Sequence, residues 1–146
     1  MPKPSREDIA AIVALLPAME AADYEFGHYD PMRQDEKGYW IWPGFHMPEL
    51  TKQWIQALWD HHMVDCEFDA GSWGMEAKRY GEHPEAVALA DFTTIRQLLT
   101  YHIRADRFVE GHLLGAWCNG HLLAVMRRLA ELHEGGACPP ARPVRK

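Results

Sequence analysis

The fold is decided by residues 94–132, TIRQLLTYHIRADRFVEGHLLGAWCNGHLLAVMRRLAEL, where apolar side chains recur every three or four positions. This spacing is typical of amphipathic helices and repeats in three successive runs. The runs are Ile95, Leu98, Leu99, His102 and Ile103; Phe108, Val109, His112, Leu113, Ala116 and Trp117; and Leu122, Val125, Met126, Leu129 and Leu132. Asp106 is placed to cap the second run, and Asn119-Gly120 to end it. The stretch therefore predicts a C-terminal three-helix unit.

The chain before this unit predicts two further helices and several shorter elements. They are a helix from Ser5 to Leu16, a helix from Pro48 to Met63, a strand or extended link from Val64 to Asp69, a brief helix from Ser72 to Tyr80 and a turn opened by Pro84. Ser5 is a candidate N-cap for the first helix. Pro17 ends that helix or restarts it, because proline is tolerated only in a first turn.

Residues 23–47 form the least regular region and are rich in aromatic side chains. The turn signals Asp30-Pro31 and Lys37-Gly38 predict one short β-hairpin, with Tyr39 to Trp42 as a strand. Two interpretations of this hairpin stay open. It caps the helical core, or it presents an aromatic interaction surface. The residues of that surface would be Tyr39, Trp40, Trp42 and Phe45.

The predicted fold is mainly α, a single compact helical domain with a C-terminal three-helix unit and one short β-hairpin. We expect the domain to span residues 1–134, because Gly135-Gly136 ends the last helical run. The remaining residues, 135–146, are expected to form a flexible basic tail.

Charge is distributed unevenly along the 146 residues, although the formal net charge is only −6. Residues 1–91 hold 17 acidic and 7 basic residues, a net of −10, whereas residues 92–146 hold 4 acidic and 8 basic residues, a net of +4. Because nucleic-acid affinity needs clustered lysine and arginine, we do not expect a general nucleic-acid binder. The acidic part suits a basic partner.

Three cysteines, an odd number without C-x-x-C spacing, argue against a disulfide framework or a zinc ribbon. No apolar run approaches the roughly 20 residues that cross a bilayer, and no leader precedes the first helix. We therefore expect a cytoplasmic protein without membrane contact. No cofactor and no metal are expected.

A charged cluster with two histidines is the candidate ligand-binding site. Its residues are His102, Arg104, Asp106, Arg107 and His112. An aspartate between two arginines holds guanidinium groups for a phosphate or a carboxylate, and a neutral imidazole serves as a general base or a metal ligand. In the structural alternative, Asp106 caps a helix, an arginine pairs with an acidic residue, and the histidines bond to the backbone or to each other.

The three helical runs also suit a helix-turn-helix arrangement. The third helix would then read nucleic acid through Arg127 and Arg128. Its first turn, however, is apolar, and recognition residues should lie near that end. We rank this interpretation below protein binding.

One family resemblance rests on the pattern LLT-x-x-x-R-x-D-R-F-x-x-G-H-L, which begins at Leu98 and ends at Leu113. Gly120-His121-Leu122 and Arg127-Arg128-Leu129 continue it. The chain resembles the bacterial and phage family named domain of unknown function 6508, over roughly residues 10–134. The resemblance implies a compact helical domain and assigns no activity to any residue.

These observations predict a small acidic protein-interaction module that acts as an adaptor or an inhibitor. Conflict between phage and host is one setting in which such a module would act. The expected partner is another protein, and no catalysis is expected, because no phosphate loop, nucleophile elbow or zinc-protease motif occurs. The first alternative is a small ligand-binding or hydrolytic site built on His102, Arg104, Arg107 and His112. The second is the helix-turn-helix-like binding of nucleic acid.

Overall fold

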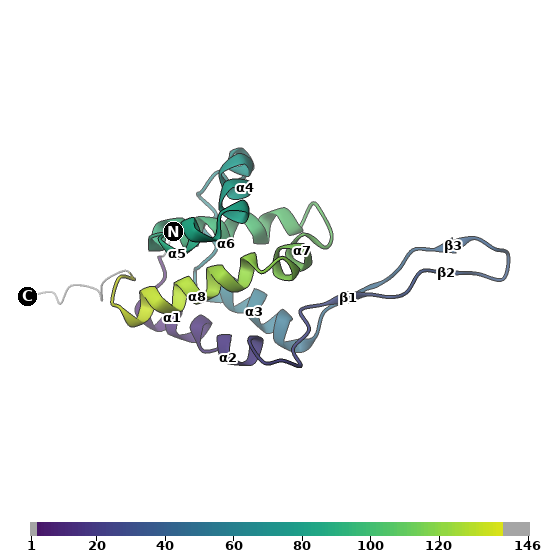
Figure 1. Ribbon diagram of the computed structural model, residues 1–146, viewed down its shortest axis with the longest axis horizontal. Helices are drawn as coiled ribbons and strands as arrows, with labels where there is room; N and C mark the ends of the chain where they lie inside the picture. Colours follow the sequence, from purple (N-terminus) through teal and green to yellow (C-terminus); the bar gives the residue numbers. More distant parts are fainter. Residues whose placement is uncertain (1–2, 139–146) are drawn as a thin grey trace, which may run out of the picture.

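The computed structural model describes residues 3–138, and Figure 1 shows a body of packed helices from which a two-stranded arm projects. In chain order the elements are α1 (Arg6–Val13), α2 (Leu16–Met19), β1 (His28–Tyr29), β2 (Arg33–Gln34), β3 (Trp40–Ile41), β4 (Phe45–His46), α3 (Glu49–Asp60), the 3-10 helix η1 (Ala70–Ser72), α4 (Gly74–Glu82), α5 (Pro84–Ala88), α6 (Phe92–Asp106), α7 (His112–Cys118) and α8 (His121–Glu134). The prediction of a mainly α fold with a short hairpin is confirmed.

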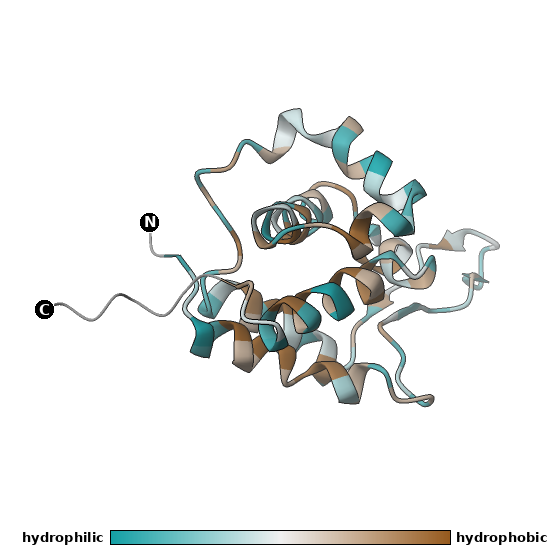
Figure 2. Cartoon of the chain, turned by 60° about the vertical axis from the view of Figure 1, so that its left-hand side comes forward, coloured by the Kyte–Doolittle hydropathy of each residue, from teal (hydrophilic) through white to brown (hydrophobic). Residues whose placement is uncertain are grey.

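Helix α8 lies at the centre of the body and packs against α1, α5, α6 and α7. Its buried face carries the predicted residues Leu122, Val125, Met126, Leu129 and Leu132, together with His121. In Figure 2 the hydrophobic segments of the helices turn toward one another in the interior of the helical body. The core is therefore built around the third helical run of residues 94–132.

Local capping signals set the ends of several helices. Ser5 and Asp8 form a reciprocal capping box at the start of α1, and Pro17 restarts the chain in the first turn of α2. The Asp91 carboxylate accepts a 2.8 Å hydrogen bond from the Thr94 backbone N–H at the start of α6. Gly120, with φ of 86°, separates α7 from α8 as predicted.

The second helix of the C-terminal unit begins later than predicted. Residues 107–111 form a loop, and α7 starts only at His112, so Phe108 and Val109 are exposed instead of packing in the core. The left-handed conformation of Gly111, with φ of 84°, places the helix start after it. Gly111, and not the predicted Asp106, is therefore the N-cap of α7. Asp106, the last residue of α6, still contacts the start of α7, because its Oδ1 accepts a 3.0 Å hydrogen bond from the Leu113 backbone N–H across the loop.

The two strand pairs belong to one hairpin, the arm, which we define as residues 27–47. His28 pairs with His46 and Arg33 with Ile41, and the paired residue numbers have the same sum throughout, so both ladders share one register. That register sets Pro31 opposite Pro43. Proline has no backbone N–H to donate, which explains why the ladder is interrupted between the two pairs.

The tip of the arm is a tight three-residue turn. Asp35 Oδ1 accepts hydrogen bonds from the backbone N–H groups of Lys37 and Tyr39, both at 2.9 Å. Gly38 takes the left-handed conformation, with φ of 83°, as a hairpin loop of this length requires. The predicted turn at Lys37-Gly38 is therefore present.

Three details differ from the sequence-based expectations. The outer part of the arm extends away from the helices instead of capping the core (Figure 1). Residues 64–69 form turns and bends instead of a strand or an extended link. Cys138 is buried in the hydrophobic core, although the predicted tail begins at residue 135, and residues 139–146 of that tail lie outside the described residues. All three cysteines are free thiols.

Among residues 3–138, no helix combines the length and the apolar character needed to span a membrane.

Candidate functional site

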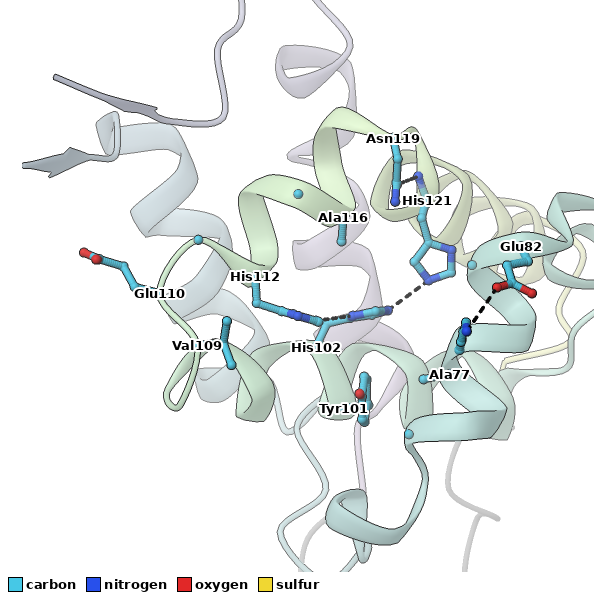
Figure 3. Close-up of a pocket in the computed structure, with 15 residues that line it drawn as sticks. Ala77, Glu82, Tyr101, His102, Val109, Glu110, His112, Ala116, Asn119 and His121 are labelled. Atoms are coloured by element: carbon cyan, nitrogen blue, oxygen red, sulfur yellow. Dashed lines mark hydrogen bonds and ion pairs between the residues drawn. The ribbon is translucent and has the colours of Figure 1, made fainter. Parts of the chain in front are cut away.

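Three histidines from three helices meet at the wall of one pocket (Figure 3). His102 projects from α6, and His112 and His121 are the first residues of α7 and α8. His102 Nδ1 lies 2.9 Å from His112 Nε2, and His102 Nε2 lies 2.9 Å from His121 Nε2. Both ring nitrogens of His102 are therefore engaged, and we call the three residues the histidine trio.

A repeated tetrapeptide positions two members of the trio. Gly-His-Leu-Leu occurs at residues 111–114 and again at 120–123. In both copies the glycine is the left-handed N-cap of a helix, so the histidine becomes the first helical residue and the first leucine turns into the core. The same local geometry thus aims two imidazoles at His102 from successive helices.

The trio is uncharged at neutral pH. Burial lowers the pKa of His102 to about 3, and the neighbouring His121 and His112 add to this shift. Burial also lowers the pKa of His112 and of His121, although Asp106 acts in the opposite direction on His112. A neutral imidazole has one donor and one acceptor, so the two hydrogen bonds run in a single direction through the trio.

The pocket beside the trio has a volume of about 580 Å³. Its other polar lining residues include Tyr101, Asn119, and the Lys78–Glu82 ion pair, whose atoms are 3.7 Å apart. Gly81 and Gly115 also line it, and a Cβ added at either position would meet nothing within 4 Å. These glycines leave open space that a ligand could fill.

The structure brings together only part of the predicted ligand-binding cluster. His102 and His112 meet, whereas Arg104 and Arg107 point elsewhere and do not line this pocket. Arg104 Nη1 donates to the Phe68 carbonyl at 3.4 Å, and the Arg107 guanidinium lies 4.9 Å from the centre of the Trp59 ring. The four-residue cluster of two histidines and two arginines does not converge on one pocket.

His121 was missing from the predicted cluster. The repeated Gly-His-Leu-Leu sequence was the signal that could have found it, because it predicts two equivalent histidines at two helix starts. Its hydrogen bond with His102 joins residues 19 positions apart, however, and depends on the packing of α6 against α8.

The predicted aromatic surface divides into two parts. Tyr39, Trp40 and Trp42 lie near the end of the arm and are 69%, 65% and 84% exposed. Phe45 instead packs at the base of the arm, with its ring centre 4.8 Å from that of Tyr29. The exposed surface therefore comprises the first three residues and excludes Phe45.

Strand alternation assigns the arm residues to two faces. Met32, Trp40 and Trp42 share one face with His28 and His46, whereas Tyr29 and Phe45 share the other face. The Tyr29 and Phe45 side chains occupy the space beside Gly111 and Gly27, where added Cβ atoms would meet them. One face of the arm thus turns to the body at its base and carries the exposed Tyr39 farther out, whereas the opposite face carries the exposed Met32, Trp40 and Trp42.

Arg127 and Arg128, which would contact nucleic acid in the helix-turn-helix interpretation, are bonded to other residues of the chain. Arg127 Nη2 lies 2.9 Å from Glu20 Oε2. Arg128 donates to the Ala90 carbonyl at 2.8 Å and forms an ion pair with Glu131. Since α8 is also surrounded by other helices, this geometry gives no support to a groove-reading role for it.

A model of one protein family, described as a family of unknown function, DUF6508, matches residues 4–135. The chain belongs to DUF6508. The resemblance predicted over roughly residues 10–134 is therefore confirmed, and the family model covers slightly more of the chain. No curated protein and no solved structure matches the chain.

Gly111 joins the histidine pocket to the base of the arm, and its replacement provides a test of that junction. We expect Gly111→Ala to lower the free energy of unfolding by about 2 kcal/mol, because the residue has a positive φ and the added Cβ would collide with the Tyr29 hydroxyl group. The measurement is urea denaturation followed by circular dichroism.

Gly120→Ala is the matched control for Gly111→Ala. Its φ of 86° is nearly the same, but an added Cβ would meet nothing within 4 Å, so we expect a loss of only about 1 kcal/mol. Equal losses in the two variants would contradict a constraining contact between Gly111 and Tyr29.

Proposed function

We propose that this chain is a protein-interaction module, an adaptor or an inhibitor acting in the cytoplasm, and that its arm is the binding element. The observation that carries the proposal is the exposed apolar face of the arm, formed by Met32, Trp40 and Trp42. Tryptophan is among the residues that contribute most to protein interfaces, because it buries a large area at a small entropic cost.

The construction of the arm supports this proposal. An isolated two-stranded hairpin is at best marginally stable in water, and the outer part of this arm has no helix packed on it. A partner that covered the apolar face would remove the two indole rings from water and add strand-backbone contacts. Binding would therefore stabilise the arm as well as the complex.

Charge favours a different protein over a second copy of this chain. The groove at the base of the arm is lined by the carboxylates of Asp23 and Glu25, and Asp30 lies on the arm beside it, within the part of the chain whose net charge is −10. Two such surfaces would repel each other. The proposed partner has an apolar pocket for the arm and a basic rim that meets these carboxylates.

Photo-crosslinking in the native host tests the proposal. A photoreactive residue at position 42 identifies the protein that the arm touches, and the purified pair is then titrated by calorimetry. We expect the double variant Trp40→Ala/Trp42→Ala to weaken this binding by a factor of about 100 or more, the loss typical of interface hot spots.

The control is Met75→Ala/Leu89→Ala, which removes two large apolar side chains that are similarly exposed on the helical body. It should leave the affinity unchanged. An equal loss in the control, or full binding by the arm variant, would refute the role of the arm. A stable homodimer of the purified chain that the arm variant dissociates would refute the heteromeric partner.

A second candidate function is the binding of a small polar ligand in the histidine pocket. The hydrogen-bonded trio favours it, because buried neutral imidazoles offer both a donor and an acceptor to a ligand. The test uses long-range ¹H–¹⁵N spectra of the histidines during titration with small neutral hydroxylated and amide compounds. Gly115→Leu fills the open space of the pocket, so it should abolish shifts that the wild type shows. Shifts that persist in this variant, or a wild type that shows none, would reject this candidate.

A further inference from the structure

The neck of the arm, where β1 pairs with β4, carries a second cluster of side chains that could bind a metal ion. It is distinct from the histidine trio. It consists of His28, Asp30 and His46. His28 and His46 are a directly paired couple of β1 and β4, and Asp30 lies two positions beyond His28. Because side chains alternate along a strand, all three project from the same face of the ribbon.

The three side chains approach one another closely. One potential ligand atom from each lies within 4.8 Å of the other two. His46 Nε2 is 2.9 Å from Asp30 Oδ1, and the two imidazole rings have their centres 5.2 Å apart, with 31° between their planes. Ligand atoms that share one zinc ion at the usual bond lengths of about 2.0–2.2 Å lie roughly 3.4 Å apart, so His46 and Asp30 already approach closely enough and His28 would move toward them by up to about 1.4 Å.

Neighbouring residues orient this cluster. Glu25 Oε1 lies 2.8 Å from His28 Nδ1, a contact that engages this nitrogen and leaves Nε2 as the one that would bind a metal ion. Gly44 faces Asp30 across the ladder, and its backbone oxygen accepts a 2.9 Å hydrogen bond from the Asp30 N–H. A Cβ at Gly44 would lie 3.0 Å from Asp30 Oδ2, so the glycine leaves the room that this carboxylate occupies.

The surroundings of the cluster also suit a cation. His28 and His46 line a groove of about 480 Å³ together with Asp23 and Glu25. These carboxylates add negative charge beside the imidazoles. Arg33 is the nearby positive charge, and strand alternation places it on the opposite face of the ribbon.

From this geometry we infer that His28, Asp30 and His46 form a binding site for a divalent transition metal ion of the zinc class. Two imidazoles and one carboxylate are a ligand set that zinc accepts, and three protein ligands leave a fourth position open for water or for another ligand. The ion joins β1 to β4 at the neck, so its binding holds the two strands of the arm together. The inference rests on the neck alone and does not depend on the proposed function.

Calorimetry with zinc chloride and visible absorption with Co²⁺ test the site, on full-length protein from which any affinity tag has been removed. We expect one ion per chain with a micromolar or lower dissociation constant, and tetrahedral Co²⁺ absorption bands.

His28→Ala, His46→Ala and Asp30→Asn should each weaken binding by a factor of about ten or more. Gly44→Ala should weaken it as well, because the added Cβ crowds Asp30. The cluster is exposed, so the variants should keep the wild-type circular dichroism spectrum.

Two control variants separate this site from other histidines. His83→Ala removes an exposed imidazole that also contacts a carboxylate, Glu85, at 3.1 Å, and should leave binding unchanged. His112→Ala removes one member of the histidine trio and should also leave zinc binding unchanged. Loss of binding in His112→Ala with retention in His46→Ala would overturn the inference. A stoichiometry above one that no variant alters, or the absence of binding below millimolar zinc, would overturn it too.

Discussion

Replacing Trp54 with alanine is expected to lower the free energy of unfolding by about 3–5 kcal/mol, the range observed when a buried tryptophan is truncated. Trp54 projects from α3 and is completely buried. Its ring centre lies 5.8 Å from that of Phe26 in an edge-to-face contact, and its indole N–H points at Met126 Sδ, 3.3 Å away on α8. The indole therefore joins α3, the chain before the arm and the central helix.

This loss is large compared with the roughly 5–15 kcal/mol by which domains are usually stable. Urea denaturation at neutral pH measures it. Trp42→Ala is the matched control, because it removes the same side chain from an exposed position and should change the free energy of unfolding by less than about 0.5 kcal/mol. Similar losses in the two variants would contradict the assignment of Trp54 to the core.

Acidification from pH 7 to pH 5 is expected to lower the free energy of unfolding by about 2 kcal/mol through His102 alone. In the unfolded chain His102 takes up a proton near its ordinary pKa of 6.5, whereas in the folded chain it does so only near pH 3. The unfolded state thus binds more protons in this interval. Stability is complete above about pH 6.5 and declines as the pH falls toward 3. His112 and His121, whose pKa values are also lowered, add to the loss in the same direction.

Urea midpoints measured between pH 5 and pH 8 provide the test. His102→Gln should reduce the slope of stability against pH by about one proton. Carboxylates act in a lower interval. Hydrogen bonds from Thr94 lower the pKa of Asp91, for example, so its contribution is lost only below its ordinary value of 3.8. An unaltered slope in His102→Gln would contradict the buried neutral state of the trio.

Local signals in the sequence predicted much of the helical body. The apolar spacing of Leu122 to Leu132 identified the buried face of α8, and Ser5 and Gly120 marked helix ends correctly. Such features depend on residues within one or two turns of each other. The same reasoning failed at Phe108 and Val109, because their apolar character continued the helical pattern although Gly111 imposes a later start for α7.

The hairpin was also predictable, since its turn signals and aromatic strand are contiguous in the sequence. Its direction was not. At the base of the arm, Tyr29 packs on Phe45 and contacts Gly111, a residue 82 positions later in the chain. No local pattern distinguishes a hairpin that covers a core from one that leaves it.

Periodicity and turn signals in the sequence were enough to predict α6, α8 and the presence of a hairpin, because such signals act over a few residues. Which polar side chains meet, in contrast, depends on how distant segments pack. The tertiary structure placed His121 beside His102, turned Arg104 and Arg107 away from them, and set His46 opposite His28. These encounters depend on helix packing and strand register, which sum many weak contacts between distant parts of the chain.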